Sequence, residues 1–181
     1  MITSPHNAKL QLLRSLQQRK HRQATGRTLI EGVRLMQEAL AAEVDLDPIV
    51  VAPERLSATA AGRALRQRLE RLPQVEQTED HLLRSVSDTV TSQGVLAAAA
   101  ITPPKPAPVD GLVLVLDGIA DPGNAGTMLR TARAAGVDTV LSTPSTVDLW
   151  SSKVVRAGMG AHFHLNLCPD ADLAELAGRE L

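Results

Sequence analysis

Apolar positions in the first 101 residues change repeatedly between helical and strand-like spacing. Leu10, Leu13 and Leu16 recur every three residues, which predicts an amphipathic helix. Ser4 or Asn7 can cap its start. Strands that alternate with helices indicate a small α/β domain with a parallel or mixed sheet. The predicted strands lie around 29–30 and at 47–53, 73–78 and 93–101, and further helices at 33–44, 54–72 and 79–87.

A proline-rich stretch then divides the chain. The segment ITPPKPAPVDG at 101–111 holds four prolines, which cannot join a helix or an inner strand. Such a segment is typical of a semi-rigid, extended spacer. We therefore expect a first domain at 1–101, a linker at 102–110 and a second domain at 111–181.

The second domain begins with one βαβ unit. The apolar run GLVLVLDG at 111–118 is typical of a parallel strand buried on both faces. A helix over 125–136, closed by Gly136, and a strand over 137–142 follow. Because ligands of open parallel sheets bind at the carboxyl ends of the strands, the loop from Asp117 to Gly126 is the strongest functional candidate.

The spacing in this loop argues against two nucleotide motifs. It has no Gly-Lys-Ser/Thr end, as a P-loop would, and its glycines are not spaced as G-x-G-x-x-G. Pro122 and Gly123 predict a sharp turn, Asn124 offers an amide to a helix cap or a ligand, and Gly126 leaves the backbone open. Arg130, one turn further in, can bind a phosphate with its planar fork of donors. The plainer interpretation is a capping asparagine and a surface arginine.

A second glycine-rich and basic segment, DLWSSKVVRAGMGAHFHLNL, occupies 148–167. Lys153 and Arg156 are three residues apart and so share one face of a short helix, before an alternating strand. With Arg130 they supply three cations for an anionic substrate. That anion can be a nucleotide or the phosphate of a nucleic acid.

Composition and charge further limit the kinds of ligand that the protein can bind. With 1% aromatic residues, base stacking on aromatic platforms is nearly excluded, and the net charge of −1 carries no global sign of nucleic-acid binding. The stretch from Lys9 to Arg34 is nevertheless basic, with Glu31 as its only carboxylate. The single cysteine, Cys168, allows neither an internal disulfide nor a zinc site. We expect a soluble cytoplasmic protein without a signal peptide, membrane span or metal.

Two long segments resemble a known family. LDGIADPGNAGTMLRTARAAGVDTVL and DLWSSKVVRAGMGAHFHLNL are similar to the first motif, and the basic segment after it, of the SpoU or TrmH-like RNA ribose 2′-O-methyltransferases of the SPOUT superfamily. The first half resembles the small ribosomal-protein-L30e-like domain that binds substrate in many members. The resemblance implies an L30e-like α/β domain followed by the first part of a SPOUT-type parallel α/β domain.

The resemblance also implies a reaction and roles for residues. Methyl would pass from S-adenosyl-L-methionine to a ribose 2′-hydroxyl of ribosomal or transfer RNA. Arg130 and Asn124 would be catalytic, and Gly126, Lys153 and Arg156 would bind substrate. Because a guanidinium is a poor proton acceptor, Arg130 would orient the hydroxyl and a phosphate rather than act as a base. The intact family member would be a homodimer.

Two later family motifs, which form the knot and most of the cofactor pocket, have no counterpart in the 181 residues. We therefore expect an incomplete enzyme whose cofactor-binding residues lie mostly beyond Leu181, and an apolar patch on the uncovered sheet. A non-catalytic module that binds structured RNA, and an α/β protein that binds a nucleotide without RNA, stay open as alternatives.

Overall fold

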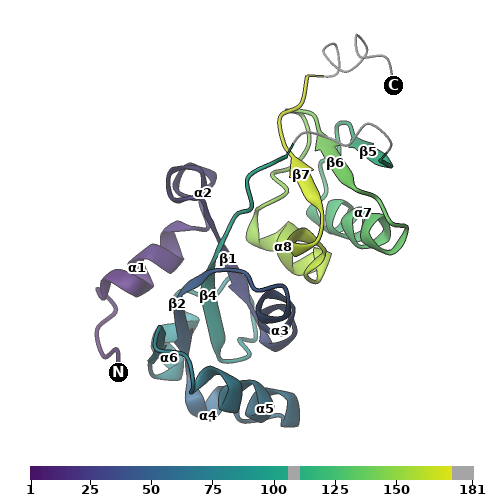
Figure 1. Cartoon of the computed structure of the whole chain (residues 1–181). Coiled ribbons are helices and arrows are strands. Elements are labelled where there is room, and N and C mark those ends of the chain that lie inside the picture. Colours follow the sequence, from purple (N-terminus) through teal and green to yellow (C-terminus); the bar gives the residue numbers. More distant parts are fainter. Residues whose placement is uncertain (106–110, 173–181) are drawn as a thin grey trace. The chain divides into compact units, whose positions relative to one another are not determined.

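The computed structural model describes residues 1–105 and 111–172. The chain divides into an N-terminal unit, residues 1–101, and a C-terminal unit, residues 102–181. The predicted α/β class is confirmed for both units (Figure 1). The elements are α1 (Ala8–Ser15), α2 (Arg19–Thr25), β1 (Arg27–Glu31), α3 (Val33–Ala41), β2 (Leu46–Val51), α4 (Pro53–Leu56), α5 (Ala60–Leu69), β3 (Val75–Gln77), α6 (Asp80–Arg84), β4 (Val95–Ala100), β5 (Val113–Leu116), α7 (Pro122–Ala134), β6 (Thr139–Ser142), α8 (Ser152–Gly158), the 3-10 turn η1 (Ala161–Phe163) and β7 (Asn166–Cys168).

The N-terminal unit is built on a mixed sheet in the order β1-β4-β2-β3. Only β2 and β3 run parallel, while β4 lies antiparallel to both β1 and β2. Leu29 and Leu96 belong to the core cluster that α1 and α6 contribute to. Since strand side chains alternate between faces, Ile30 and Ala97 point to the opposite face, where α3 packs on β1 and β4. Helices thus cover both faces of this sheet.

Two predicted helices of the N-terminal unit are broken in the structure. The first, expected within 4–23, ends at Ser15, and α2 begins at Arg19; between them the buried guanidinium of Arg22 donates to the carbonyl oxygens of Leu16 and Gln17 at 2.8 and 2.9 Å. The predicted helix over 54–72 is α4 and α5, which restart at the Thr59 cap. At each break a side chain binds backbone groups that the helix leaves without a partner: Arg22 binds the carbonyl oxygens after α1, and the Thr59 hydroxyl accepts from the N–H of Gly62 at the start of α5. Asn7, not Ser4, caps α1.

The C-terminal unit has three parallel strands in the order β5-β6-β7. Two successive right-handed crossovers in one direction place α7 and α8 on the same face of the sheet, where they pack side by side (Figure 1). The alternating strand predicted after the short basic helix is only partly correct, since 161–163 forms η1 and β7 begins at Asn166. Gly136 follows α7 with φ of 75°, the left-handed conformation expected after a helix end.

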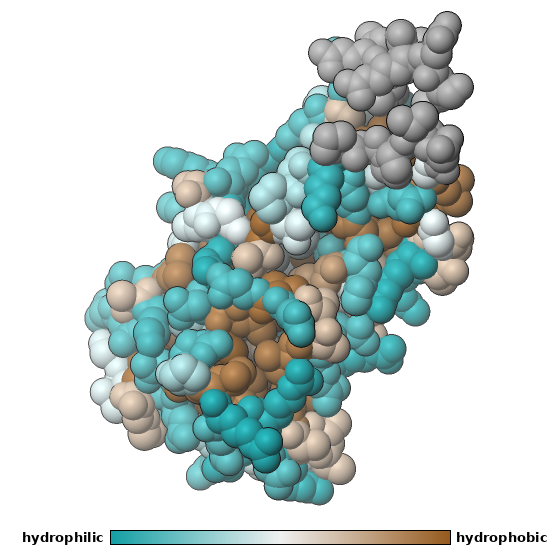
Figure 2. All heavy atoms as spheres, in the orientation of Figure 1, coloured by the Kyte–Doolittle hydropathy of each residue, from teal (hydrophilic) through white to brown (hydrophobic). Residues whose placement is uncertain are grey.

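The predicted burial of the first strand of this unit on both faces is wrong for the described residues. Val115 is 43% exposed and Leu112, just before β5, is 55% exposed. Figure 2 shows apolar side chains at the surface of this unit next to β5. For Val115 the reason is that α7 and α8 cover one face of the sheet only, so its side chain on the other face remains in contact with solvent.

The proline-rich segment is anchored at its start. Asn166 of β7 accepts from the backbone N–H of Lys105 at 2.8 Å and donates from its side chain to the Lys105 carbonyl oxygen, also at 2.8 Å. On the other side, the N–H of Ile101 donates to the Gly26 carbonyl oxygen at 2.7 Å. The described part of the linker is therefore held on β7 at Lys105; residues 106–110 lie outside the described residues.

Candidate functional site

Two loops at the carboxyl edge of β5 and β6 are joined by hydrogen bonds. The carbonyl oxygen of Leu116 accepts from the N–H of Thr143 at 3.1 Å and from the hydroxyl of Thr146 at 2.8 Å. Further out, the N–H of Val147 donates to the Ile119 carbonyl oxygen at 2.8 Å. Because the first loop leads into α7 and the second into α8, these bonds fix where both helices begin.

A side-chain cluster completes this connection. The hydroxyl of Thr143 donates to Asp117 Oδ1 at 2.9 Å, accepts from the N–H of Gly118 at 3.3 Å, and lies 2.9 Å from the Ser145 hydroxyl. Asp117 is exposed and lies directly after β5, at the carboxyl edge of the sheet. Asp117 lies in the candidate loop predicted from the sequence, but nothing in the sequence indicates that Thr143 holds it.

Asn124 does not cap α7. Asp121 is the cap, and its Oδ1 accepts from the backbone N–H of Asn124 at 2.7 Å, while Pro122 and Gly123 form the first turn of the helix. The prediction of a separate sharp turn there is wrong, because Pro at the first helical position fits the helix itself. The amide side chain of Asn124 is exposed and has no hydrogen-bond partner among the described residues.

Gly126 lies where α7 meets α8. A Cβ at this position would lie 2.4 Å from the Ala157 Cβ and 2.8 Å from the Gly158 nitrogen. The two helices therefore touch backbone to backbone, and the absent side chain is what allows it. The structure gives Gly126 a packing role, and its contact with substrate stays a prediction.

Arg130 lies further along α7 than the sequence analysis placed it. It is the ninth residue of α7, about 12 Å along the helix axis from Pro122 at 1.5 Å per residue, hence two turns in rather than one. Its guanidinium is exposed and unpaired among the described residues. Being four residues after Gly126, it shares the side of α7 that turns toward α8.

The other two predicted cations lie on α8, one turn apart as expected. Ser151 caps this helix, Lys153 is exposed and Arg156 is half-buried. The Lys153 ammonium has no partner among the described residues. All five predicted site residues thus lie on two adjacent helices, with α7 carrying Asn124, Gly126 and Arg130 and α8 carrying Lys153 and Arg156.

His162 is a buried group that the sequence analysis did not single out. Its imidazole is fully enclosed, its Nε2 lies 2.8 Å from the Leu149 carbonyl oxygen, and its ring centroid lies 5.3 Å from that of Trp150. Burial lowers the pKa of His162 to about 4, more than the bond to Leu149 and the charge of Asp148 raise it. The ring is therefore neutral near pH 7, and its Nε2 carries the proton that Leu149 accepts.

The pKa of His162 predicts a pH dependence of stability. The unfolded chain binds a proton near the ordinary value of 6.5 and the folded chain only near 4, so the folded state is destabilised as the pH falls through this window. We expect the free energy of unfolding of the C-terminal unit to fall by about 2 kcal/mol between about pH 6.5 and about pH 4.5. Denaturant titrations followed by the fluorescence of the single tryptophan, Trp150, measure it. His162→Phe should lack this fall, and an equal fall in that variant would contradict the assignment.

The basic N-terminal stretch is largely occupied by internal contacts. Lys9 pairs with Glu76 at 2.6 Å, which lowers the pKa of that carboxyl, Arg27 pairs with Asp45 at 2.6 Å, and Arg22 is buried. The stretch is therefore not one free basic face: Lys9 and Arg27 are paired with carboxylates, and Arg22 is buried against the carbonyl oxygens of Leu16 and Gln17. Arg34, on α3, is exposed and unpaired among the described residues.

Arg34 lines an open groove of about 910 Å³ between α3, the start of α5 and residues 91–93. Arg55 lies in the same groove and donates from Nε to the Ser92 carbonyl oxygen at 2.8 Å. The hydroxyls of Thr59 and Thr91 also line it. The groove therefore presents two guanidinium groups beside hydroxyl groups and the carboxylate of Glu38.

The loop that walls this groove is held by a buried carboxylate. Glu31, at the end of β1, accepts from the hydroxyls of Ser87 and Thr89 at 2.5 and 2.6 Å. Further along, Gln93 Oε1 accepts from the N–H of Val33 at 2.7 Å. Val90, at the tip between these attachments, is fully exposed. An ordered loop thus presents an apolar tip beside the groove.

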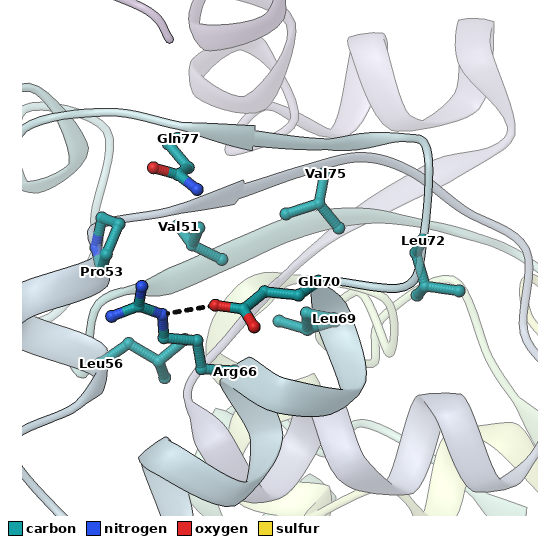
Figure 3. A pocket seen from close by; sticks show the side chains of 9 residues that line it. All are labelled: Val51, Pro53, Leu56, Arg66, Leu69, Glu70, Leu72, Val75 and Gln77. Carbon is teal, nitrogen blue, oxygen red and sulfur yellow. Dashed lines mark hydrogen bonds and ion pairs between the residues drawn. The ribbon is translucent and has the colours of Figure 1, made fainter.

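A smaller pocket of about 130 Å³ in the N-terminal unit offers little chemistry. Val51, Leu69 and Val75 line it, and Figure 3 shows the Arg66–Glu70 ion pair, 2.9 Å long, beside them. The two charges neutralise each other, so the pocket has no free charged group for a ligand.

Within residues 1–105 and 111–172, no group of three or more His, Cys, Asp or Glu side chains is arranged to hold a metal ion. Within the same ranges, no helix is long and apolar enough to cross a membrane.

Two family models match the chain, one for each unit. Residues 7–97 match the MRM3-like substrate binding domain, and residues 111–179 match the SpoU rRNA Methylase family. Among curated relatives, the 23S rRNA (guanosine(2553)-2′-O)-methyltransferase RlmP of Bacillus subtilis is 34% identical over 164 residues, covering 91% of this chain and 62% of the relative. The human mitochondrial rRNA methyltransferase 3 is 36% identical over 159 residues, covering 81% and 36%. The chain thus spans between about a third and two thirds of the length of these relatives.

Solved structures give the same result. A crystal structure of an RNA 2′-O ribose methyltransferase superposes with a TM-score of 0.74 at 32% identity, covering 97% of this chain and 67% of that one. The AdoMet-bound rRNA methyltransferase of Sinorhizobium meliloti superposes with a TM-score of 0.72 at 26% identity, covering 93% and 63%. The chain belongs to the SpoU rRNA methylase family.

Proposed function

We propose that the complete protein transfers a methyl group from S-adenosyl-L-methionine to a ribose 2′-hydroxyl of ribosomal RNA. The observation that carries this is the set of exposed side chains of Asn124, Arg130 and Lys153, which have no partner among the described residues and lie within the segment that matches the SpoU family. The relatives are named as methyltransferases of ribosomal RNA, and we take this to favour ribosomal RNA over transfer RNA as the substrate.

In this proposal the two helices bind and orient the RNA. Lys153 and Arg156 bind backbone phosphates, and Arg130 holds the reacting hydroxyl and its phosphate with its planar donors. Asn124 orients substrate through its amide, which is free because Asp121 takes over the cap. Such positioning is the main catalytic resource of a transfer that needs no covalent enzyme intermediate.

The described residues do not by themselves form the pocket for the methyl donor. Among the described residues of the C-terminal unit, the buried side-chain polar atom without a partner is Nδ1 of His162, and it faces Gly158 rather than the carboxyl edge. The polar groups at that edge, Asp117, Thr143 and Ser145, bond to one another. We therefore propose that most of the donor pocket comes from residues outside the described ranges, and we expect a homodimer, as for the family. The single cysteine supports a reducing, cytoplasmic location.

A direct assay tests the reaction. The complete protein is incubated with labelled S-adenosyl-L-methionine and transcribed large-subunit ribosomal RNA, and the methylated nucleotide is located by its resistance to alkaline cleavage. We expect label at a ribose 2′ position. RNA binding without methylation would favour the non-catalytic module, and nucleotide binding without RNA binding would favour the third alternative.

We propose that the groove of the N-terminal unit contributes to RNA binding. The free guanidinium of Arg34 suits a phosphate, and the exposed Val90 offers an apolar contact to an unstacked base in place of the missing aromatic residues. The N-terminal unit would thus position the RNA, while the C-terminal unit carries out the transfer.

Arg34→Glu is expected to weaken RNA binding about 10-fold, since it removes one phosphate contact and adds repulsion. The slope of log affinity against log salt should fall by about 1. Filter binding over a series of salt concentrations measures both. Arg71→Glu, which makes the same charge change at an exposed residue that does not line the groove, is the control. Equal losses in the two variants would mean that the groove has no special role.

A further inference from the structure

The backbone of Gly158, the last residue of α8, is enclosed from two sides. On one side lies α7, whose Gly126 would bring a Cβ within 2.8 Å of the Gly158 nitrogen. On the other side lies the imidazole of His162, since a Cβ on Gly158 would be 2.5 Å from its Cε1. The end of α8 can therefore not move toward either neighbour.

The same imidazole also holds the segment before α8. Its Nε2–H donates to the carbonyl oxygen of Leu149, two residues before the cap Ser151, and its ring packs against Trp150 at an angle of 58°. His162 thus connects the chain that enters α8 with the residue that ends it. Lys153 and Arg156 lie between these two points.

We propose that His162 is a positioning residue for substrate binding, which holds α8 against α7 so that Lys153 and Arg156 meet the RNA backbone in a fixed geometry. The inference rests on the proposed function, because it concerns how these cations bind RNA. The role needs the neutral ring, because its single N–H matches the single acceptor, the Leu149 carbonyl oxygen. The same arrangement leaves Nδ1 buried without a partner among the described residues, which is unfavourable. A phenyl ring of similar shape would fill the space but leave the Leu149 carbonyl oxygen without its donor.

The test measures RNA binding by the complete protein, with transcribed large-subunit ribosomal RNA as the probe, well below the melting temperature of every variant. For His162→Phe we expect a 5- to 10-fold loss of affinity, and a salt slope lowered by about 1, as in Arg156→Ala. Adding Arg156→Ala to His162→Phe should then cost less than 2-fold, because the misplaced arginine no longer contributes. His162→Gln, whose amide N–H can reach Leu149, should recover part of the affinity.

Leu167→Val, a change in the buried core of the same unit, controls for a loss of stability alone and should leave the salt slope unchanged. If His162→Phe binds with the wild-type affinity and slope, or if the losses of the two changes simply multiply, the positioning role is wrong. If the wild-type protein does not bind RNA, the proposed function itself fails, which is a different result. If His162→Phe does not fold, His162→Gln is compared with wild type instead. A lower affinity with a lower salt slope then supports the positioning role, and wild-type affinity and slope contradict it.

Discussion

Replacing Arg130 by alanine in the complete protein is expected to lower 2′-O-methylation at least about 100-fold while the fold stays intact. The size follows from removing charged donors that act where the reacting hydroxyl and phosphate are held. The fold should not change, because the guanidinium is exposed and unpaired among the described residues and alanine favours a helix. Single-turnover methylation and the thermal melt of the same preparation measure the two effects.

Arg133→Ala is the matched control for this experiment. Arg133 is exposed on the same helix, three residues further along, and its loss removes the same charge. We expect its methylation rate to stay within a few-fold of wild type. Comparable losses in both variants would indicate that α7 acts through its total charge, and an active Arg130→Ala enzyme would remove Arg130 from the chemistry.

Gly126→Val is expected to destabilise the C-terminal unit by about 3 kcal/mol or more. The Cβ alone would approach the Ala157 Cβ to 2.4 Å and the Gly158 nitrogen to 2.8 Å, and valine adds two methyl groups to a contact formed by backbone. Overpacking of this kind forces helices apart, and the higher helix propensity of valine over glycine offsets only a fraction of it. Denaturant unfolding followed by Trp150 fluorescence reports on this unit alone.

Two further variants separate packing from backbone effects at Gly126. In Gly123→Ala the new Cβ meets only the end of the Asp121 side chain, at 3.1 Å, so we expect a change of less than about 1 kcal/mol. Adding Ala157→Gly to Gly126→Ala should recover part of the lost stability, since it removes the nearest of the three clashing atoms. A Gly126→Val protein as stable as wild type would show that α8 can shift without cost, which would also weaken the positioning role of His162.

At the candidate loop, the residue order predicts which element forms, whereas the capping contact is known only from the structure. The residue order of strand, Asp-Pro-Gly-Asn and helix identified the correct element, because the residues that begin a helix act on their immediate neighbours. Which residue caps it could not be read in the same way. Asp121 and Asn124 are both capable of capping, and the backbone geometry at the start of α7 decides for Asp121.

The sequence by itself determined the α/β class, the order of the elements, and the residues of α7 and α8 that resemble a methyltransferase site. The class and the order follow from local spacing, which a single chain carries in full, and the site residues follow from the resemblance to the SpoU family. Only the tertiary structure decided that Gly126 lies at a contact between two helices and that His162 is neutral and enclosed. It also decided that Lys9 and Arg27 form ion pairs with Glu76 and Asp45. The physical reason is the same in each case: the partner is distant in sequence or lies on another element, and burial exists only once the chain has folded.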